Sequence, residues 1–177
     1  MENTYRVETT LPLQFFTCPM DALTDFWLNW QPADEGPGVF HFDASLALGV
    51  RAQLIDDDDL KRLVQEIAPI AELRYLYLAE NRNITNRGMR FLADLTQLRY
   101  LNISSCDINS EGLEFLPALT VLEMLDISYC NRISGAGGKY IQKLPKLKTL
   151  LVQGTTKLNT ADLKKVAKRG LEIRTGK

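Results

Sequence analysis

Hydrophobic positions recur at a fixed spacing in the second part of the chain, as one unit written about four times. Each copy reads leucine, two variable residues, leucine, one variable residue, and a further aliphatic residue. The copies begin at Leu73, Leu98, Leu122 and Leu147, and a short fifth copy begins at Leu171. Successive starts lie 25, 24, 25 and 24 residues apart. A regular period of this length is typical of chains that stack one structural unit on the next.

The pattern within each copy predicts a strand, a turn and a helix. The alternating leucines suit a short strand with one buried face. The ninth residue of each copy is expected to satisfy backbone groups where the strand turns away, and these residues are Asn81, Cys106, Cys130 and Thr155. A polar residue that can cap a helix follows, namely Thr85, Asn109, Ser134 and Asn159. Apolar residues at helical spacing come next.

The unit resembles the leucine-rich repeat, because each copy reads Leu-x-x-Leu-x-Leu-x-x-Asn/Cys with an aliphatic residue shortly afterwards. The copies that contain Cys106 and Cys130 resemble its cysteine-containing subtype. That subtype is common in substrate-recognition subunits of ubiquitin ligases and also occurs in bacterial proteins. The resemblance covers about Leu46 to Ile173. It implies an α/β fold: a short leucine-rich repeat solenoid with parallel strands on the concave face and helices on the convex face.

Two segments are predicted. Residues 1–40 lack the repeat and are expected to form an N-terminal cap, possibly a docking segment, with a strand near Val7 to Phe16 and a short helix from Pro19 to Trp30. Residues 41–177 are expected to form the leucine-rich repeat domain of about four to five repeats, the first of them irregular. Trp27 and Trp30 lie three residues apart, which would place them on one helical face as anchors of the cap.

Composition points to an ordinary globular chain, with 45% hydrophobic and 24% charged residues. No apolar run approaches the roughly 20 residues that span a membrane, and the first residues do not have the pattern of a secretory signal. Cys106 and Cys130 occupy equivalent repeat positions, so we expect buried thiols and not a disulfide. A reducing, cytoplasmic location fits this cysteine usage best.

Charge is divided unevenly along the chain. Residues 1–60 carry eleven acidic side chains against Arg6 and Arg51, a net charge of −9, whereas residues 139–177 carry eleven basic side chains against Asp162 and Glu172, a net charge of +9. Such asymmetry bears on partners and association. It is compatible with a monomer or with weak, charge-driven head-to-tail self-association.

No pattern of a catalytic or metal site is present in the sequence. The single histidine, His41, has no nucleophile motif beside it, and neither a phosphate-binding loop nor a Cys-x-x-Cys pair occurs. The acidic run from Asp56 to Asp59 lacks the ligand spacing of a calcium loop. It is better suited to capping a helix N-terminus. We therefore expect no enzymatic activity, no cofactor and no metal.

The concave face carries the candidate binding surface, because alternate strand residues should point away from the core there. The predicted partner-binding residues are Arg74, Tyr75, Tyr77, Arg99, Tyr100, Asn102, Met124, Asp126 and Tyr129. Tyrosine and arginine are enriched at interface hot spots, and methionine suits adaptable surfaces. The alternative is that these rings pack on one another across neighbouring strands.

Three functions remain open. The first is a non-catalytic protein-interaction scaffold that recognises an unidentified protein on the concave face. The second is an adaptor or assembly subunit that docks through residues 1–40, for example of the ubiquitin-ligase substrate-recognition type. The third is binding of nucleic acid or an acidic surface through residues 139–177. Nucleic acid is the less favoured ligand, since Tyr140 is the only aromatic residue there that could stack on a base.

Overall fold

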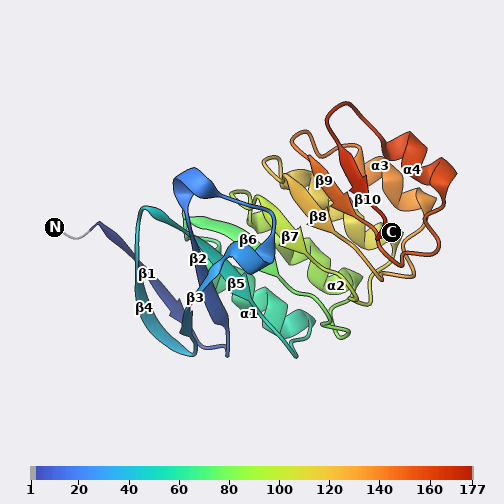
Figure 1. Ribbon diagram of the computed structural model, residues 1–177. Helices are drawn as coiled ribbons and strands as arrows, with labels where there is room; N and C mark the ends of the chain where they lie inside the picture. The colour runs from blue at the N-terminus through green and yellow to red at the C-terminus, as the bar shows by residue number, and fades with distance from the viewer. Residues whose placement is uncertain (1–2, 177) are drawn as a thin grey trace.

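An eight-stranded sheet runs through the computed structural model, which describes residues 3–176. Its strand order is β10-β9-β8-β7-β6-β5-β2-β3. The six strands from β5 to β10 are parallel and follow one another in chain order (Figure 1). They are β5 Leu46–Arg51, β6 Leu73–Tyr77, β7 Tyr100–Asn102, β8 Met124–Asp126, β9 Thr149–Leu151 and β10 Glu172–Arg174. The α/β class with parallel repeat strands is therefore present.

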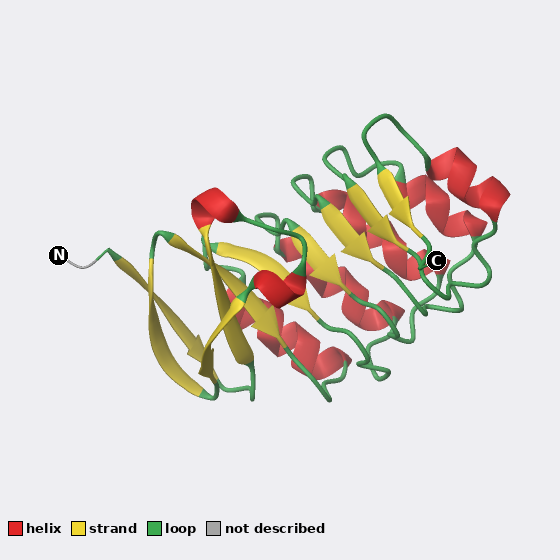
Figure 2. Ribbon diagram, in the orientation of Figure 1, coloured by secondary structure: helices red, strands yellow, loops and turns green. Residues whose placement is uncertain are grey.

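Helices cover one face of these parallel strands and leave the other without a helical layer (Figure 2). The α-helices are α1 Asp57–Ile67, α2 Asn86–Met89, α3 Gly138–Ile141 and α4 Thr160–Val166. The tighter 3-10 helices Arg90–Asp94, Ser110–Ala118 and Gly135–Gly137 complete the layer. In the longest of these, Pro117 lacks a backbone N–H and so disfavours a regular α-helix. We call the face that this layer leaves uncovered the open face.

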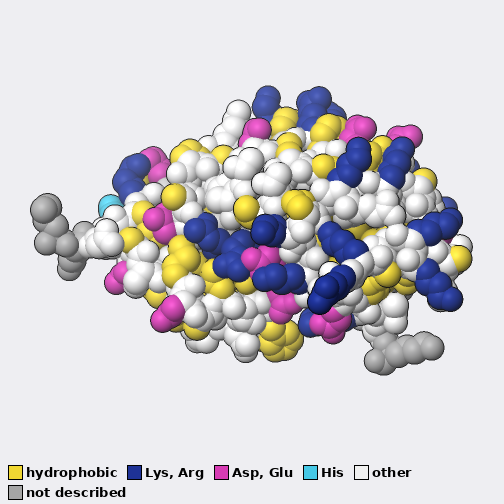
Figure 3. Space-filling model, turned by 90° about the horizontal axis from the view of Figure 1, so that it is seen from above, with side chains coloured by type: hydrophobic (Ala, Val, Ile, Leu, Met, Phe, Trp, Pro, Cys, Tyr) yellow, Lys and Arg dark blue, Asp and Glu magenta, His cyan; other side chains and the backbone are white. Residues whose placement is uncertain are grey.

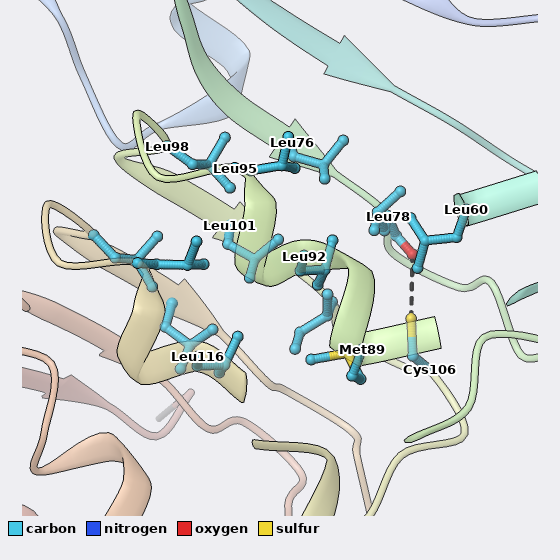
Figure 4. Close-up of a cluster of buried hydrophobic side chains, with 14 of the residues drawn as sticks. Leu60, Leu76, Leu78, Met89, Leu92, Leu95, Leu98, Leu101, Cys106 and Leu116 are labelled. Atoms are coloured by element: carbon cyan, nitrogen blue, oxygen red, sulfur yellow. Dashed lines mark hydrogen bonds between the residues drawn. The ribbon is translucent and has the colours of Figure 1, made fainter. Parts of the chain in front are cut away.

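The core lies between the strands and the helical layer. Leu76 and Leu101 point from β6 and β7 toward Leu92, Leu95 and Leu116 of the helical segments (Figure 4). All five side chains are buried. Because every repeat supplies the same layer of leucines, stacking the repeats makes one continuous apolar core.

The ninth residue of each repeat joins that repeat to the one before it. The Asn81 amide donates to the Ala52 carbonyl at 2.9 Å, and the Cys106 thiol donates to the Leu78 carbonyl at 3.3 Å (Figure 4). The Cys130 thiol and the Thr155 hydroxyl repeat this contact with Ile103 and Ile127, at 3.2 and 2.9 Å. The predicted backbone role of these residues is confirmed, and Cys106 and Cys130 are buried free thiols.

A second set of contacts joins the helical starts. The Asp57 carboxylate accepts from the Thr85 backbone N–H at 2.8 Å, and the Asn86 side chain accepts from the Asn109 backbone N–H at 3.0 Å. Of the predicted caps, Thr85, Asn109 and Asn159 accept hydrogen bonds from their own helices. Ser134 does not, because its hydroxyl faces Ser110 at 3.2 Å. Asp56 caps α1 in a reciprocal pair with Asp59, as the acidic run predicted.

The N-terminal strands extend and close one end of this core. β1 Thr4–Thr9 and β4 Gly38–Asp43 form a separate antiparallel pair, while β2 Gln14–Pro19 pairs antiparallel with β5, and β3 Gln31–Glu35 pairs with β2 at the sheet edge. Val7, Leu11, Leu13 and Phe15 are buried against the first repeat. The boundary predicted at residue 40 lies inside β4.

Between β2 and β3 the chain leaves the sheet and crosses the open face (Figure 1). We call residues 20–30 the strap. It contains only two short 3-10 helices, Met20–Ala22 and Trp27–Asn29. The single helix predicted from Pro19 to Trp30 is therefore wrong. The strap is held by contacts with the sheet in place of the regular hydrogen bonds of a helix.

Candidate partner-binding surface

The strap covers the tyrosine patch that the sequence placed on an exposed face. Tyr75, Tyr100 and Met124 are only 2%, 4% and 2% exposed. The Trp27 ring lies edge-on to Tyr75 with ring centroids 4.6 Å apart, and Trp30 lies edge-on to Tyr75 at 5.6 Å. The predicted exposure of these three residues is therefore wrong. Their apolar surface is buried by the chain itself, which is the outcome that hydrophobic burial favours when a covering segment is available.

Polar contacts fix the strap in place. The Tyr75 hydroxyl donates to the Asp25 backbone carbonyl at 3.3 Å, and the Thr149 hydroxyl donates to the Asp25 carboxylate at 3.0 Å. The Trp30 indole N–H donates to the Thr24 carbonyl at 3.0 Å. Burial is the main reason that the pKa of Tyr75 is raised, and the nearby carboxylate of Asp126 raises it further. Tyr75 is thus held in its neutral, hydrogen-bonding form.

Below the strap, the open face has a polar floor that remains partly accessible. The Asp126 carboxylate accepts from the Ser128 backbone N–H at 2.8 Å and from the Asn102 amide at 3.3 Å. Burial raises the pKa of Asp126, and the bonds from Ser128 oppose that shift. Tyr77 is half-buried beside this floor, with the Arg51 guanidinium 5.3 Å from its ring centroid. Asn102 is buried, whereas Asp126 retains some exposure.

The ends of the strands form a row with an uncommon backbone conformation, which we call the rim. Its members have φ between 57° and 67° and are Leu54, Glu80, Ser105, Tyr129 and Gly154. This left-handed region suits glycine and asparagine and costs other residues roughly 1–2 kcal/mol. Leu54 is nevertheless 97% exposed and Tyr129 50% exposed. Apolar side chains are thus presented to solvent from strained positions.

A hollow of about 530 Å³ adjoins the rim at the ends of β7 and β8. It is lined by Ser105 and Tyr129 together with Arg82, Arg132 and their neighbours. The sequence singled out Tyr129 but missed Leu54. Leu54, like Tyr129, lies three residues after the end of its strand, but the irregular first repeat obscures this equivalence in the sequence.

Arg74 and Arg99 belong to a different edge, where the strands begin. The Arg99 guanidinium lies 5.8 Å from the centroid of the Tyr100 ring. It therefore packs against the covered patch from the edge where the strands begin. Both arginines line a groove of about 570 Å³ on that edge. The structure therefore does not bring the nine predicted residues together at one site. Some lie in the covered patch, some on the polar floor or the rim, and the two arginines in the groove at the opposite edge.

Among the described residues, no group of three or more histidine, cysteine, aspartate or glutamate side chains is arranged to hold a metal ion. Within residues 3–176, helices that combine the length and the apolar character of a membrane span are also absent.

Comparison with known proteins bears on the fold. A family model described as "Leucine Rich repeat" matches residues 95–116 and 118–141, two consecutive units of the stack. A search of curated protein sequences gave no match.

Among solved structures, the chain is similar to one in the crystal structure of the Rad7 and Elc1 complex in yeast. The identity is 20% and the TM-score is 0.52, and the match covers 67% of this chain and 30% of that chain. At this identity the likeness concerns the fold. The matched units, the regular strand spacing and the helical layer lead to one conclusion: residues 95–116 and 118–141 are leucine-rich repeats, and the neighbouring units continue the same parallel sheet.

Proposed function

We propose that this chain is a non-catalytic protein-interaction module whose partner contacts the rim and the accessible floor of the open face. The stacked repeats would form a short solenoid with the open face as its concave side. The observation that carries the proposal is the pair of exposed apolar side chains, Leu54 and Tyr129, held in left-handed backbone conformations. The repeat geometry imposes this conformation on one residue of each unit, and at these two positions it presents an apolar side chain to solvent.

The geometry of the rim supports a macromolecular partner. Leu54 and Tyr129 follow strands β5 and β8, which are three strand steps apart, or about 14 Å at the usual strand spacing. Glu80 and Ser105 lie between them, and the hollow beside Tyr129 could accept a side chain of the partner. Asp126 and Tyr77 would supply polar contacts at the margin. The partner site is therefore shifted from the Tyr75 and Tyr100 rings toward the ends of the strands.

The test is affinity capture with the double variant Leu54→Asn/Tyr129→Asn. Asparagine tolerates the left-handed conformation better than leucine or tyrosine, so these changes should not unfold the protein. Val39→Asn is the matched control, because Val39 is an exposed apolar residue of β4 away from the rim. We expect a protein identified by mass spectrometry to be captured by wild type and by the control and lost with the rim variant. Equal capture by all three would contradict a rim site.

An adaptor role through residues 1–40 is a second proposal, supported by Phe26 and Leu28. These strap residues are 54% and 78% exposed although their neighbours are packed against the sheet. The fold neighbour comes from a structure of a complex, which is compatible with assembly into a larger unit. The variant Phe26→Ser/Leu28→Ser should lose a docking partner while the rim variant keeps it. Retention of every partner by the strap variant would remove this alternative.

A reducing, cytoplasmic compartment belongs to the same proposal. Its support is that Cys18, Cys106 and Cys130 are all buried free thiols. Measuring the location of a tagged full-length protein by fluorescence microscopy would test it directly.

A further inference from the structure

A basic groove lies along the edge where the parallel strands begin, opposite the rim. The second residue of four consecutive units stands there in a column: Arg74, Arg99, Glu123 and Lys148. Backbone bonds hold the column in register, because the N–H groups of Arg99, Glu123 and Lys148 each donate to the carbonyl of the preceding member, at 3.0, 2.8 and 2.8 Å. The position of these side chains is thus fixed by the repeat itself.

The groove has a volume of about 570 Å³. Besides the column, it is lined by Thr96, Gln97, Val121 and Lys146. Four cationic side chains face one carboxylate, a net charge of +3. Figure 3 looks onto the side from which the strands begin, and lysine and arginine side chains gather in the middle of that face.

Ion pairing inside the groove leaves some of its positive charge without a carboxylate partner. The Glu123 carboxylate is bridged by the Arg99 Nε at 2.8 Å and by the Lys148 Nζ at 2.8 Å. Burial opposes ionisation of Glu123, but hydrogen bonds from Lys148 and Arg99 outweigh it and lower the pKa of this carboxyl group. Arg74 and Lys146 form no ion pair with any of residues 3–176. The surplus cations therefore stand at the two ends, one on each side of Glu123.

We propose that this groove binds an extended acidic peptide segment of a partner protein. Arg74 and Lys148 are three strand steps apart, about 14 Å, which an extended peptide covers with about four residues. Carboxylates of the peptide would lie over Arg74 and Arg99 at one end and over Lys146 and Lys148 at the other. An uncharged, apolar residue would lie in the middle, where Val121 is 39% exposed and Glu123 repels negative charge.

The same features disfavour a nucleic-acid strand as the occupant. A polynucleotide carries its charges without interruption, so a phosphate would be forced against Glu123. No aromatic side chain is among the residues that line the groove, and base stacking on aromatic rings is a main source of affinity for single strands. The groove is also separate from the rim. This proposal can therefore be wrong while the proposed function is right, and the reverse.

The experiment is fluorescence anisotropy with a labelled peptide that reads Asp-Glu-Leu-Glu-Asp between serines. The wild-type chain should bind it, and binding should weaken several-fold between about 50 and 300 mM NaCl because exposed charges are screened. The double variant Arg74→Gln/Lys146→Gln should bind at least about tenfold more weakly, since it removes two unpaired cations and breaks no ion pair of the described residues. Val121→Asp should also weaken binding, because it adds a carboxylate at the centre.

Lys164→Gln/Lys165→Gln is the matched control. It makes the same charge change on exposed residues of α4 outside the groove, and binding should change less than about twofold. Circular dichroism of every variant verifies the fold. Four results would each overturn the proposal: equal loss with this control, equal binding of the Asn-Gln-Leu-Gln-Asn peptide, effective competition by oligothymidylate, or no peptide binding together with concentration-dependent self-association that the groove variant abolishes.

Discussion

The Thr149 hydroxyl donates a hydrogen bond to the Asp25 carboxylate at 3.0 Å, although the two residues lie 124 positions apart. Arg174 approaches the same carboxylate at 3.9 Å. The strap that leaves β2 at the N-terminal side thus reaches β9 and β10 at the other end of the sheet. Through this contact, one short segment joins the first and the last repeats.

We predict that the Asp25–Thr149 contact contributes to stability as a coupled pair. Asp25→Ala and Thr149→Val should each lower the free energy of unfolding. The double variant should lower it by less than the sum of the two single effects. The difference should be about 1 kcal/mol, the usual net value of one hydrogen bond. Urea unfolding of the four proteins measures it. Additive effects would mean that the two side chains do not interact in solution.

Trp27 should be the main apolar anchor of the strap. Its ring contacts Tyr75 at 4.6 Å, Phe16 at 4.5 Å and Tyr77 at 5.0 Å between centroids. Trp27→Ala should lower the free energy of unfolding by about 2–3 kcal/mol, less than a fully buried aromatic because the ring is only partly buried. The neighbouring Leu28→Ala should change it by less than about 0.5 kcal/mol, since Leu28 is exposed. Similar losses in both variants would contradict the anchor role.

Gly88 should be required by the close packing of successive helices. A Cβ added there would lie 2.3 Å from the Asp57 carboxylate, which Thr85 holds through its N–H at 2.8 Å and its hydroxyl at 2.7 Å. We expect Gly88→Ala to destabilise the fold by about 2 kcal/mol in thermal or urea unfolding, despite the better helix propensity of alanine. The cost should shrink in an Asp57→Ala background, where the clash is absent. An unchanged cost in that background would place the strain elsewhere.

Alkaline pH should weaken the fold. Burial raises the pKa of Cys130 from 9.0 to about 11, and burial also raises that of Cys106. Because the folded pKa exceeds the unfolded one, this stability is intact below about pH 9 and is lost as the pH rises toward 11. Cys130 alone should account for about 3 kcal/mol across that window.

Urea midpoints between pH 7 and 11 would measure this loss, and Cys130→Ala should make the decline shallower. A thiol reagent at pH 8 should react with Cys130 only after unfolding, since the side chain is 1% exposed. A midpoint that does not change up to pH 11, or rapid labelling of the native protein, would contradict the prediction.

Several features of the repeats were predicted from the sequence. They form contacts between fixed positions of successive units, as in the bond of Cys106 with Leu78 or of Asp57 with Thr85, each pair 28 residues apart. A repeated contact leaves a repeated residue type, so the strands, the ninth-residue bonds, the buried cysteines and the Asp56 cap all had a periodic signal. The exception, Ser134, shows that one hydroxyl can serve either its own helix or its neighbour.

The sequence did not predict which segment covers Tyr75 and Tyr100. Large aromatic rings on strand positions are equally suited to contact with a partner, with one another or with a distant segment of the same chain. Trp27 and Trp30 were assigned to the cap, but their pairing with Tyr75 has no period and no fixed separation. The exposure of Leu54 was missed for a related reason, because the irregular first repeat hides its equivalence with Tyr129.

The amino-acid sequence by itself therefore determined the repeating unit, its parallel strands, the role of the ninth residue and most of the helix caps. These follow from local periodicity and from stacking at a fixed distance. Only the tertiary structure decided what covers part of the open face. That cover depends on the strap reaching from Asp25 to Thr149, and non-directional burial of apolar surface over such a separation leaves no pattern along the chain.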